Sequence, residues 1–146
     1  MCISMITFDI IPAYVNAFIF VFLAVLHVYW VVGGEWGIAG TIPTDSNGRR
    51  TFIPRKGGTL VVALGLFLFA AINLMYVGLL RVDIEQSILR YAIIGVGALF
   101  LLRAIGDFRY VGMTKRFTRT TFAVRDKWIY IPLCLVLVLG HVLLLM

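Results

Sequence analysis

The segment LLRAIGDFRYVGMTKR, residues 101–116, holds the densest group of side chains that could do chemistry. If this segment is helical, Arg103 and Asp107 lie one turn apart on one face and Tyr110 follows a turn later, whereas Arg109 points elsewhere. An arginine side chain suits phosphate and carboxylate groups because its guanidinium donates paired hydrogen bonds. The pattern therefore indicates a pocket for an anion or, in the simpler interpretation, an ion pair at the end of a helix.

His27 is the second candidate, because an ionisable residue inside an apolar stretch is a functional suspect. Asn16 and Trp30 lie on the same helical face, and an imidazole can act as an acid or a base near neutral pH. The alternative is that His27 only hydrogen-bonds a backbone carbonyl, and the residues leave both interpretations open. A lone histidine with no second ligand at helical spacing does not make a metal site, so we expect neither a metal nor a cofactor.

Other polar and small residues in the apolar stretches predict how the helices pack. Asn73 and Tyr76 are expected to hydrogen-bond between helices, and His141 is expected at the membrane interface. Stripes of small residues let membrane helices approach closely. The predicted contact stripes are Ala63 with Ala70, and Ala92 with Gly95 and Gly106.

The elements that carry these residues are four apolar stretches. The chain has 146 residues, of which 62% are hydrophobic and 14% are charged, whereas soluble domains are typically ~45–50% apolar. Since about 20 apolar residues cross the hydrocarbon layer of a membrane, we expect an all-α, four-helix transmembrane bundle in one domain, residues 1–146. The predicted spans are residues 12–32, 59–80, 88–105 and 128–146, with Pro12 in the first position of its helix.

The third span is the weakest of the four, because only residues 91–102 are free of charge. Arg90 and Arg103 are expected to reach opposite membrane interfaces with their long side chains. The alternative is a re-entrant or surface segment.

The basic residues predict the orientation of the bundle. Residues 33–58 and 103–127 hold 11 of the 13 lysines and arginines. The net charge of +6 could by itself suggest nucleic acid, but cations gathered in the connections between spans follow the positive-inside rule instead. We therefore expect no nucleic-acid partner, cytoplasmic connections between spans one and two and between spans three and four, and both termini outside.

Two segments resemble a bacterial family of small four-helix membrane proteins of unknown function: HVYWVVGGEWG (27–37) and FLLRAIGDFRYVGMTKRFTRTTFAVRDKWIYIPLCL (100–135). The resemblance covers nearly the whole chain and departs from the family pattern at residues 131–132, where Ile-Pro replaces a usual Ser-Pro. It implies a multi-pass protein of the bacterial inner (plasma) membrane and supplies no substrate or catalytic residue. The matching positions are His27, Trp30, Gly34, Trp36, Arg103, Gly106, Asp107, Arg109, Tyr110, Lys115, Thr120 and Asp126.

These observations leave three functions open. The first is a binding or regulatory protein that holds an anionic small molecule, a lipid head group or a partner protein at a cluster on the cytoplasmic side. The candidate ligand-binding residues are His27, Trp30, Trp36, Arg103, Asp107, Arg109 and Tyr110. Membrane lipids with anionic head groups are the expected partners, because basic segments at the membrane surface attract them.

The second function is a membrane enzyme acting on a lipid-soluble substrate, with His27 and Asp107 as an acid–base pair. The chain has no recognisable nucleophile or metal motif, which weighs against an enzyme. The third function is a small transporter built as a homo-oligomer. It is disfavoured because every Asp and Glu lies at or beyond the end of a predicted span.

Overall fold

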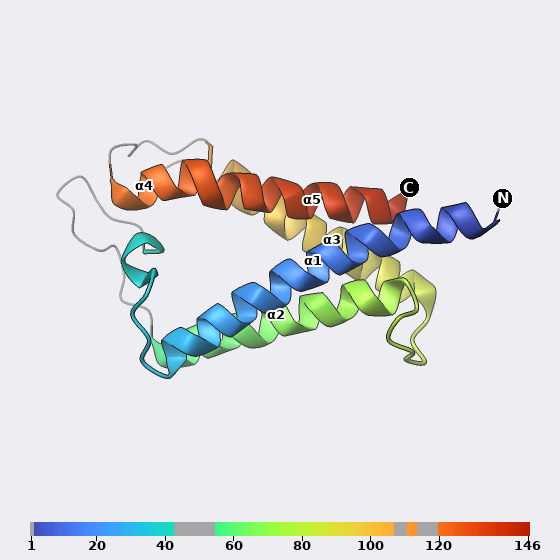
Figure 1. Cartoon of the computed structure of the whole chain (residues 1–146), viewed down its shortest axis with the longest axis horizontal. Helices are drawn as coiled ribbons and strands as arrows, with labels where there is room; N and C mark the ends of the chain where they lie inside the picture. Colours follow the sequence, from blue (N-terminus) through green and yellow to red (C-terminus); the bar gives the residue numbers. More distant parts are fainter. Residues whose placement is uncertain (1, 43–54, 107–110, 114–119) are drawn as a thin grey trace.

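The regular structure of the chain is helical. The computed structural model describes residues 2–42, 55–106, 111–113 and 120–146, and no strand occurs in these ranges. In chain order, the elements are α1 (Cys2–Val31), the short 3-10 helix η1 (Ile38–Gly40), α2 (Lys56–Tyr76), α3 (Gln86–Ile105), α4 (Thr121–Arg125), the π-helical turn η2 (Asp126–Tyr130) and α5 (Ile131–Leu145) (Figure 1).

Four helical stretches in these ranges are long and apolar enough to cross a membrane: Ile10–Val31, Lys56–Tyr76, Gln86–Ile105 and Phe122–Leu145. Only 22–33% of the most apolar part of each stretch is buried, so most of its apolar side chains face outward. Such a surface is stable in lipid and unfavourable in water. The predicted fold class, an all-helical chain with four membrane-spanning helices, is therefore confirmed.

All four predicted spans begin earlier than expected, and the difference is largest for the first and the last. α1 begins at Cys2, so Pro12 lies inside the helix and its predicted place at the first helical position is wrong. The last span begins at Phe122, because α4, η2 and α5 follow one another without a break. The π-helical turn η2 comes just before Pro132. A proline ring and its missing N–H conflict with a regular α-helical turn, and a wider turn accommodates them.

The four long helices form two pairs. α1 packs most extensively against α2, and α3 against α5, while contacts of α1 with α5 and of α2 with α3 join the pairs. Figure 1 shows both chain termini at one end of the bundle and η1 and α4 at the other. The core between the pairs contains the rings of Phe20, Phe69 and Phe100, whose centroids lie 5.3–6.2 Å apart.

Of the two predicted contact stripes of small residues, the one on α2 is confirmed and the one on α3 is wrong. Ala63 and Ala70 are buried on the packed face of α2, as predicted. On α3 the predicted stripe is wrong, because Gly95 is exposed with open space where a side chain would begin, and Gly106 follows the helix end. Gly97 is the glycine of α3 that approaches a neighbour, since an added Cβ would lie 3.1 Å from the Cβ of His141.

Three polar side chains lie within the apolar core: Asn16 of α1, Asn73 of α2 and His141 of α5. The prediction of an interfacial position for His141 is wrong, because its side chain is only 2% exposed. The prediction of an interhelical hydrogen bond for Asn73 is confirmed, since Asn16 Nδ2 donates to Asn73 Oδ1 at 3.1 Å.

Candidate functional site

His27 and Trp30 lie near the end of α1, at the end of the bundle that contains η1 and α4. Gly33 there adopts a φ of +105°, a left-handed conformation that side chains other than glycine rarely adopt. Its N–H donates to the Trp30 carbonyl at 3.2 Å, and the Gly34 N–H donates to the Tyr29 carbonyl at 2.9 Å. These two bonds satisfy the last carbonyls of the helix and reverse the chain. The following residues then return across the end of α1 as η1.

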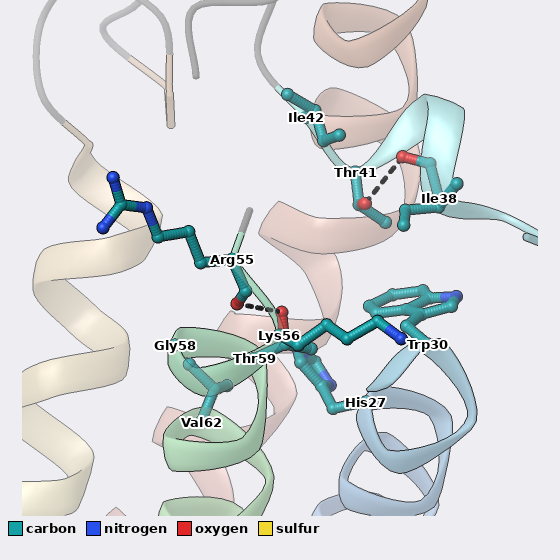
Figure 2. A pocket seen from close by; sticks show the side chains of 10 residues that line it. All are labelled: His27, Trp30, Ile38, Thr41, Ile42, Arg55, Lys56, Gly58, Thr59 and Val62. Atoms are coloured by element: carbon teal, nitrogen blue, oxygen red, sulfur yellow. Dashed lines mark hydrogen bonds between the residues drawn. The ribbon is translucent and has the colours of Figure 1, made fainter. Parts of the chain in front are cut away.

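A pocket of about 460 Å³ opens between the end of α1, the start of α2 and η1 (Figure 2). Sites for small ligands usually measure roughly 300–1,000 Å³, so this volume suits one. The lining residues are His27 and Trp30 of α1, Ile38, Thr41 and Ile42 of η1 and the residues after it, and Arg55, Lys56, Gly58, Thr59 and Val62 at the start of α2.

His27 and Trp30 form the α1 wall of the pocket. The Nδ1 atom of His27 lies 2.7 Å from the Leu23 carbonyl. Because a carbonyl can only accept, Nδ1 carries the proton, and Nε2 is the remaining polar atom of the ring. The rings of His27 and Trp30 pack edge to face, with centroids 4.8 Å apart. Trp30 Nε1 donates to the Trp36 carbonyl at 2.9 Å, which fixes the orientation of the indole.

The first turn of α2 supplies the positive part of the pocket. The side chain of Arg55 does not cap the helix, and the Thr59 N–H and Oγ1 both donate to the Arg55 carbonyl, at 3.1 and 3.2 Å. The backbone N–H groups of residues 56–58 therefore have no acceptor within the helix, as at any helix start. Figure 2 shows the Lys56 side chain extending toward Trp30, whereas the Arg55 guanidinium points away from both.

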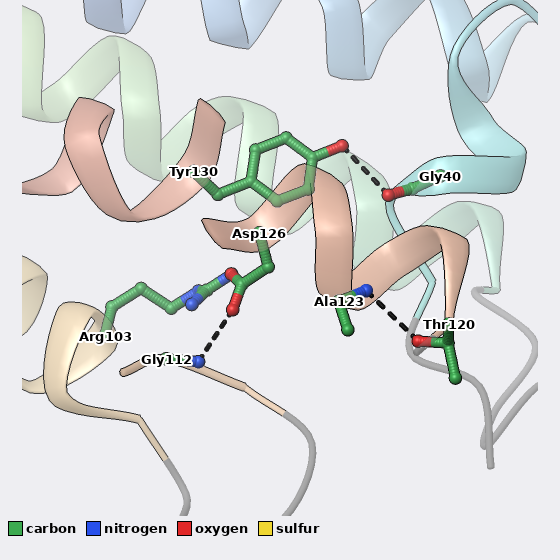
Figure 3. Close-up of polar contacts among 7 residues, drawn as sticks. All are labelled: Gly40, Arg103, Gly112, Thr120, Ala123, Asp126 and Tyr130. Atoms are coloured by element: carbon green, nitrogen blue, oxygen red, sulfur yellow. Dashed lines mark hydrogen bonds and ion pairs between the residues drawn. The ribbon is translucent and has the colours of Figure 1, made fainter. Parts of the chain in front are cut away.

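The third wall, formed by η1 and the residues after it, is attached to η2 and α4. The Tyr130 hydroxyl donates to the Gly40 carbonyl at 3.0 Å (Figure 3), and Arg125 Nη1 donates to the Gly37 carbonyl at 3.4 Å. A side chain at Gly40 would collide with the side chain of Arg125. The pocket wall therefore depends on a segment about 90 residues further along the chain.

Arg103 lies at the same end of the bundle but does not line the pocket. Its Nη2 is 2.9 Å from Oδ1 of Asp126, whose side chain is fully buried. The Gly112 N–H donates to the other carboxylate oxygen of Asp126 at 2.8 Å (Figure 3). A buried carboxylate is costly unless it is paired and hydrogen-bonded, and these contacts provide both. Through this ion pair, Arg103 joins α3 to η2.

Two glycines shape the backbone that delivers the Gly112 N–H to Asp126. Gly106 and Gly112 have φ values of +92° and +85°. A side chain at Gly112 would collide with the backbone of Gly106, so the chain returns here with no room for one. The Met113 N–H donates to the Ala104 carbonyl at 3.0 Å and closes the return. This Arg103–Asp126–Gly112 group is called the ion-pair cluster below.

The structure separates the residues that the sequence grouped into one site. His27 and Trp30 line the pocket, Trp36 contributes a backbone carbonyl while its side chain is 72% exposed, and Arg103 belongs to the ion-pair cluster. α3 ends at Ile105, so the helical spacing assumed for Arg103 and Asp107 does not continue that far. The predicted site residues Asp107, Arg109 and Tyr110 lie outside the residues that the structure describes.

Sequence reasoning missed Lys56 and Thr59 as pocket residues. A signal was available, because Arg55-Lys56-Gly57-Gly58 precedes an uncharged span and thus places a cation and free N–H groups at a helix start. Tyr130, which positions a wall of the pocket, was also not among the predicted site residues. Within the described ranges, no group of three His, Cys, Asp or Glu residues is arranged to hold a metal ion.

Comparison with known proteins shows the family of this chain. The chain belongs to the family described as "protein of unknown function (DUF3995)", whose sequence model matches residues 20–141. The match confirms the resemblance to a family of unknown function and includes the pocket residues of α1 and α2 and the ion-pair cluster. No curated protein and no solved structure matches the chain.

Proposed function

We propose that this member of a family of unknown function binds an anionic, phosphate-bearing ligand in the pocket between α1, α2 and η1. The main observation behind the proposal is the set of groups that surround one cavity. The cation of Lys56 and the free N–H groups at the start of α2 share a cavity of about 460 Å³ with His27 and Trp30.

The charges around the pocket favour an anion. The charge comes from Lys56, because the Arg55 guanidinium points away from Lys56 and Trp30 (Figure 2), and no carboxylate is among the lining residues that the structure describes. The start of a 21-residue helix adds the positive end of its dipole. Backbone N–H groups at such a helix start are a common binding site for phosphate. The Lys56 cation and the N–H groups of residues 56–58 would therefore act together on a negative group at the start of α2.

The α1 wall suits the remainder of such a ligand. His27 Nε2 can accept a hydrogen bond when the ring is neutral and donate one when it is protonated, because Nδ1 is bonded to Leu23. Trp30 offers an apolar ring held in one orientation by Trp36. Val62 extends this apolar lining one turn further into the span of α2. A ligand with a charged head and an apolar body would match both parts.

This proposal narrows the hypothesis drawn from the sequence. Arg103 was expected to bind the anion, but its Nη2 is engaged by a buried carboxylate and its Nη1 is enclosed by protein. We therefore assign the binding of the anion to Lys56 instead of Arg103. His27 and Trp30 remain candidate ligand-binding residues.

We place the pocket on the cytoplasmic side of the bacterial inner membrane. The connections at the pocket end of the bundle hold most of the lysines and arginines, and such connections remain in the cytoplasm. The ligand would then be the head group of an inner-leaflet lipid or a soluble phosphate compound of the cytoplasm. Both share the chemistry that the pocket recognises.

Native mass spectrometry tests the proposal. The protein is placed in nanodiscs of phosphatidylcholine with a minor fraction of phosphatidylglycerol, and the lipid retained after release is identified. Wild type is expected to retain phosphatidylglycerol, and Lys56→Gln to lose it. Arg55→Gln is the matched control, because it removes the same charge at the neighbouring residue, whose guanidinium points away from Lys56 and Trp30.

A second measurement distinguishes the source of the phosphate. Calorimetric titration of inorganic phosphate into nanodiscs made only of phosphatidylcholine detects a soluble ligand. Heat that Lys56→Gln abolishes and Arg55→Gln preserves would identify a soluble phosphate compound. Equal lipid retention by wild type and both variants, together with no heat from phosphate, would overturn the proposal.

A further inference from the structure

Among the described residues that line the pocket, Thr41 and Thr59 carry hydroxyl groups, and each has its hydrogen committed to a backbone carbonyl. Thr41 Oγ1 donates to the Ile38 carbonyl at 2.9 Å, and Thr59 Oγ1 donates to the Arg55 carbonyl at 3.2 Å (Figure 2). A hydroxyl group has one hydrogen and two lone pairs. Both threonines therefore keep lone pairs that can accept from a ligand, whereas a ligand acceptor would have to displace a bond that is already made.

The ring nitrogens on the α1 wall of the pocket are committed in the same way. His27 Nδ1 donates to the Leu23 carbonyl at 2.7 Å, so Nε2 of the neutral ring is an acceptor. Trp30 Nε1, which can only donate, is engaged by the Trp36 carbonyl at 2.9 Å. These two rings therefore offer a ligand one acceptor, His27 Nε2, and no donor.

The donors that face the pocket are gathered in the first turn of α2. The Lys56 ammonium can only donate, and the backbone N–H groups of residues 56–58 have no acceptor within the helix. The acceptors come from all three walls: His27 on α1, Thr41 directly after η1 and Thr59 on α2. A matching ligand must therefore present negative charge to the start of α2 and hydrogen-bond donors to the other polar atoms.

A phosphate group alone matches only the first part of this arrangement. Its ionised oxygens would accept from Lys56, but they would meet only lone pairs at His27 Nε2 and Thr41 Oγ1. Polar atoms that lose water without gaining a partner lower the affinity. An ammonium group beside the phosphate would supply donors, but it would add a second positive charge to a pocket with no carboxylate among its described lining residues. Hydroxyl groups supply donors without a charge.

We infer that the ligand of this pocket is a phosphate ester of a polyol, carried either by a lipid, as in the glycerol head group of phosphatidylglycerol, or by a soluble compound. The inference rests on the proposed function, in which a phosphate binds at the start of α2. The phosphate accepts from Lys56 and the free N–H groups, and the hydroxyl groups of the polyol donate to His27 Nε2 and to Oγ1 of Thr41 and Thr59. Sites that hydrogen-bond a hydroxyl group discriminate against an analogue that lacks it.

Competition between two lipids tests the inference. Phosphatidylpropanol has the same phosphodiester and the same single negative charge as phosphatidylglycerol, but it lacks both hydroxyl groups of the head group. The full chain is placed in phosphatidylcholine nanodiscs with equal minor fractions of the two lipids, at about pH 8, where an imidazole is ordinarily neutral. Native mass spectrometry is expected to find phosphatidylglycerol retained over phosphatidylpropanol by about tenfold, the value of the hydrogen bonds that the second lipid cannot make.

Variants of Thr41 test whether this selectivity comes from the pocket. Thr41→Val keeps the shape of the side chain without Oγ1, so the preference for phosphatidylglycerol should fall by about threefold while phosphatidylpropanol is retained as in wild type. Thr41→Ser restores a hydroxyl group and should restore the wild-type ratio. If Thr41 only supports the fold, Thr41→Val lowers the retention of both lipids and leaves their ratio unchanged, which would overturn the inference.

Calorimetry distinguishes a soluble ligand from a lipid. Glycerol phosphate and propyl phosphate form the matched soluble pair, and each is titrated into nanodiscs made only of phosphatidylcholine. Heat from glycerol phosphate that exceeds the heat from propyl phosphate would support a soluble polyol phosphate. Selective retention of phosphatidylglycerol with no heat from either compound would support the lipid.

Failure of the inference can be told apart from failure of the proposed function. If each matched pair binds equally and Lys56→Gln abolishes the binding, a phosphate binds at α2 without recognition of the hydroxyl groups, so the inference is wrong and the proposed function stands. If neither lipid is retained and neither phosphate gives heat, the proposed function is wrong and the inference is wrong with it. Equal retention that Lys56→Gln leaves unchanged would also overturn both.

Discussion

The pocket and the ion-pair cluster lie at the same end of the bundle and use similar residues in opposite ways. In the ion-pair cluster, Arg103 is bonded to a fully buried Asp126, and backbone folds tightly around the pair. In the pocket, Lys56 and the start of α2 face open space with no carboxylate among the described lining residues. The difference teaches that a cation near a membrane surface signals binding only when its charge remains unpaired.

The pocket and the ion-pair cluster are also expected to differ in how much they contribute to stability. Groups that are paired and buried contribute to folding, so changing them should lower stability. Groups that line a cavity contribute little to folding, so changing them should leave stability intact and alter ligand retention. The following variants, ordered by expected effect, test whether the two regions divide in this way.

The largest effect is expected from Asp126→Asn. The change leaves Arg103 without a counter-ion next to a buried amide, and the free energy of unfolding should fall by about 3 kcal/mol. This is the lower end of the range for buried pairs, because 33% of the Arg103 side chain is exposed. Denaturation in detergent micelles measures it. Glu35→Gln, which neutralises an exposed carboxylate, is the control and should change stability by less than about 0.5 kcal/mol.

A double variant sharpens this prediction. Removing both charges, with Arg103→Gln and Asp126→Asn together, should recover part of the lost stability, because the charge that Asp126→Asn leaves on Arg103 is then also removed. If Asp126→Asn alone is as stable as wild type, the ion-pair cluster is not a folding element and Arg103 returns as a candidate for ligand binding.

The next largest effect is expected from Gly112→Ala, compared with Gly58→Ala. A side chain at Gly112 would collide with Gly106 and would be held at a φ of +85°, so stability should fall by about 2 kcal/mol. Gly58 has open space around it, and alanine there should leave stability unchanged or raise it by up to about 1 kcal/mol. Thermal unfolding of both variants measures these changes. Equal losses of stability in the two variants would contradict the difference between a tightly packed ion-pair cluster and an open pocket.

A smaller effect is expected from Tyr130→Phe, which tests the connection between the two regions. The change removes the hydrogen bond to the Gly40 carbonyl, and stability should fall by about 1 kcal/mol. Because that bond positions a pocket wall, phosphatidylglycerol retention should fall as well. Loss of stability with retention unchanged would show that the wall does not depend on Tyr130.

The smallest effect on stability is expected from Lys56→Gln. Lys56 is exposed at the start of α2, so the free energy of unfolding should change by less than about 0.5 kcal/mol. Retention of the anionic lipid should nevertheless be lost. If Lys56→Gln loses both stability and the bound lipid, the distinction between the two regions is wrong, because Lys56 then contributes to folding.

The sequence predicted the parts of the site that lie on a single helix. His27 and Trp30 share one face of α1 and were expected together, and the structure places both in the pocket. The pairing of Arg103 was not predictable from helical spacing, because its partner Asp126 lies 23 residues away across a segment that turns at Gly106 and Gly112. His141 was placed at the interface because its position along the span was considered without the rotation of α5, which directs it into the core.

By itself, the amino-acid sequence determined the four membrane-spanning helices, the location of most basic residues in the connections, and membership of a family of unknown function. Each of these depends on local properties: the length and hydropathy of a stretch, or the order of residues in a motif. Only the tertiary structure decided which cations are paired with a carboxylate and which glycines pack closely against another part of the chain. It also decided that Asn16, Asn73 and His141 contact one another. Those outcomes depend on how each helix is rotated against the others, and in lipid that rotation is set by close packing between helices.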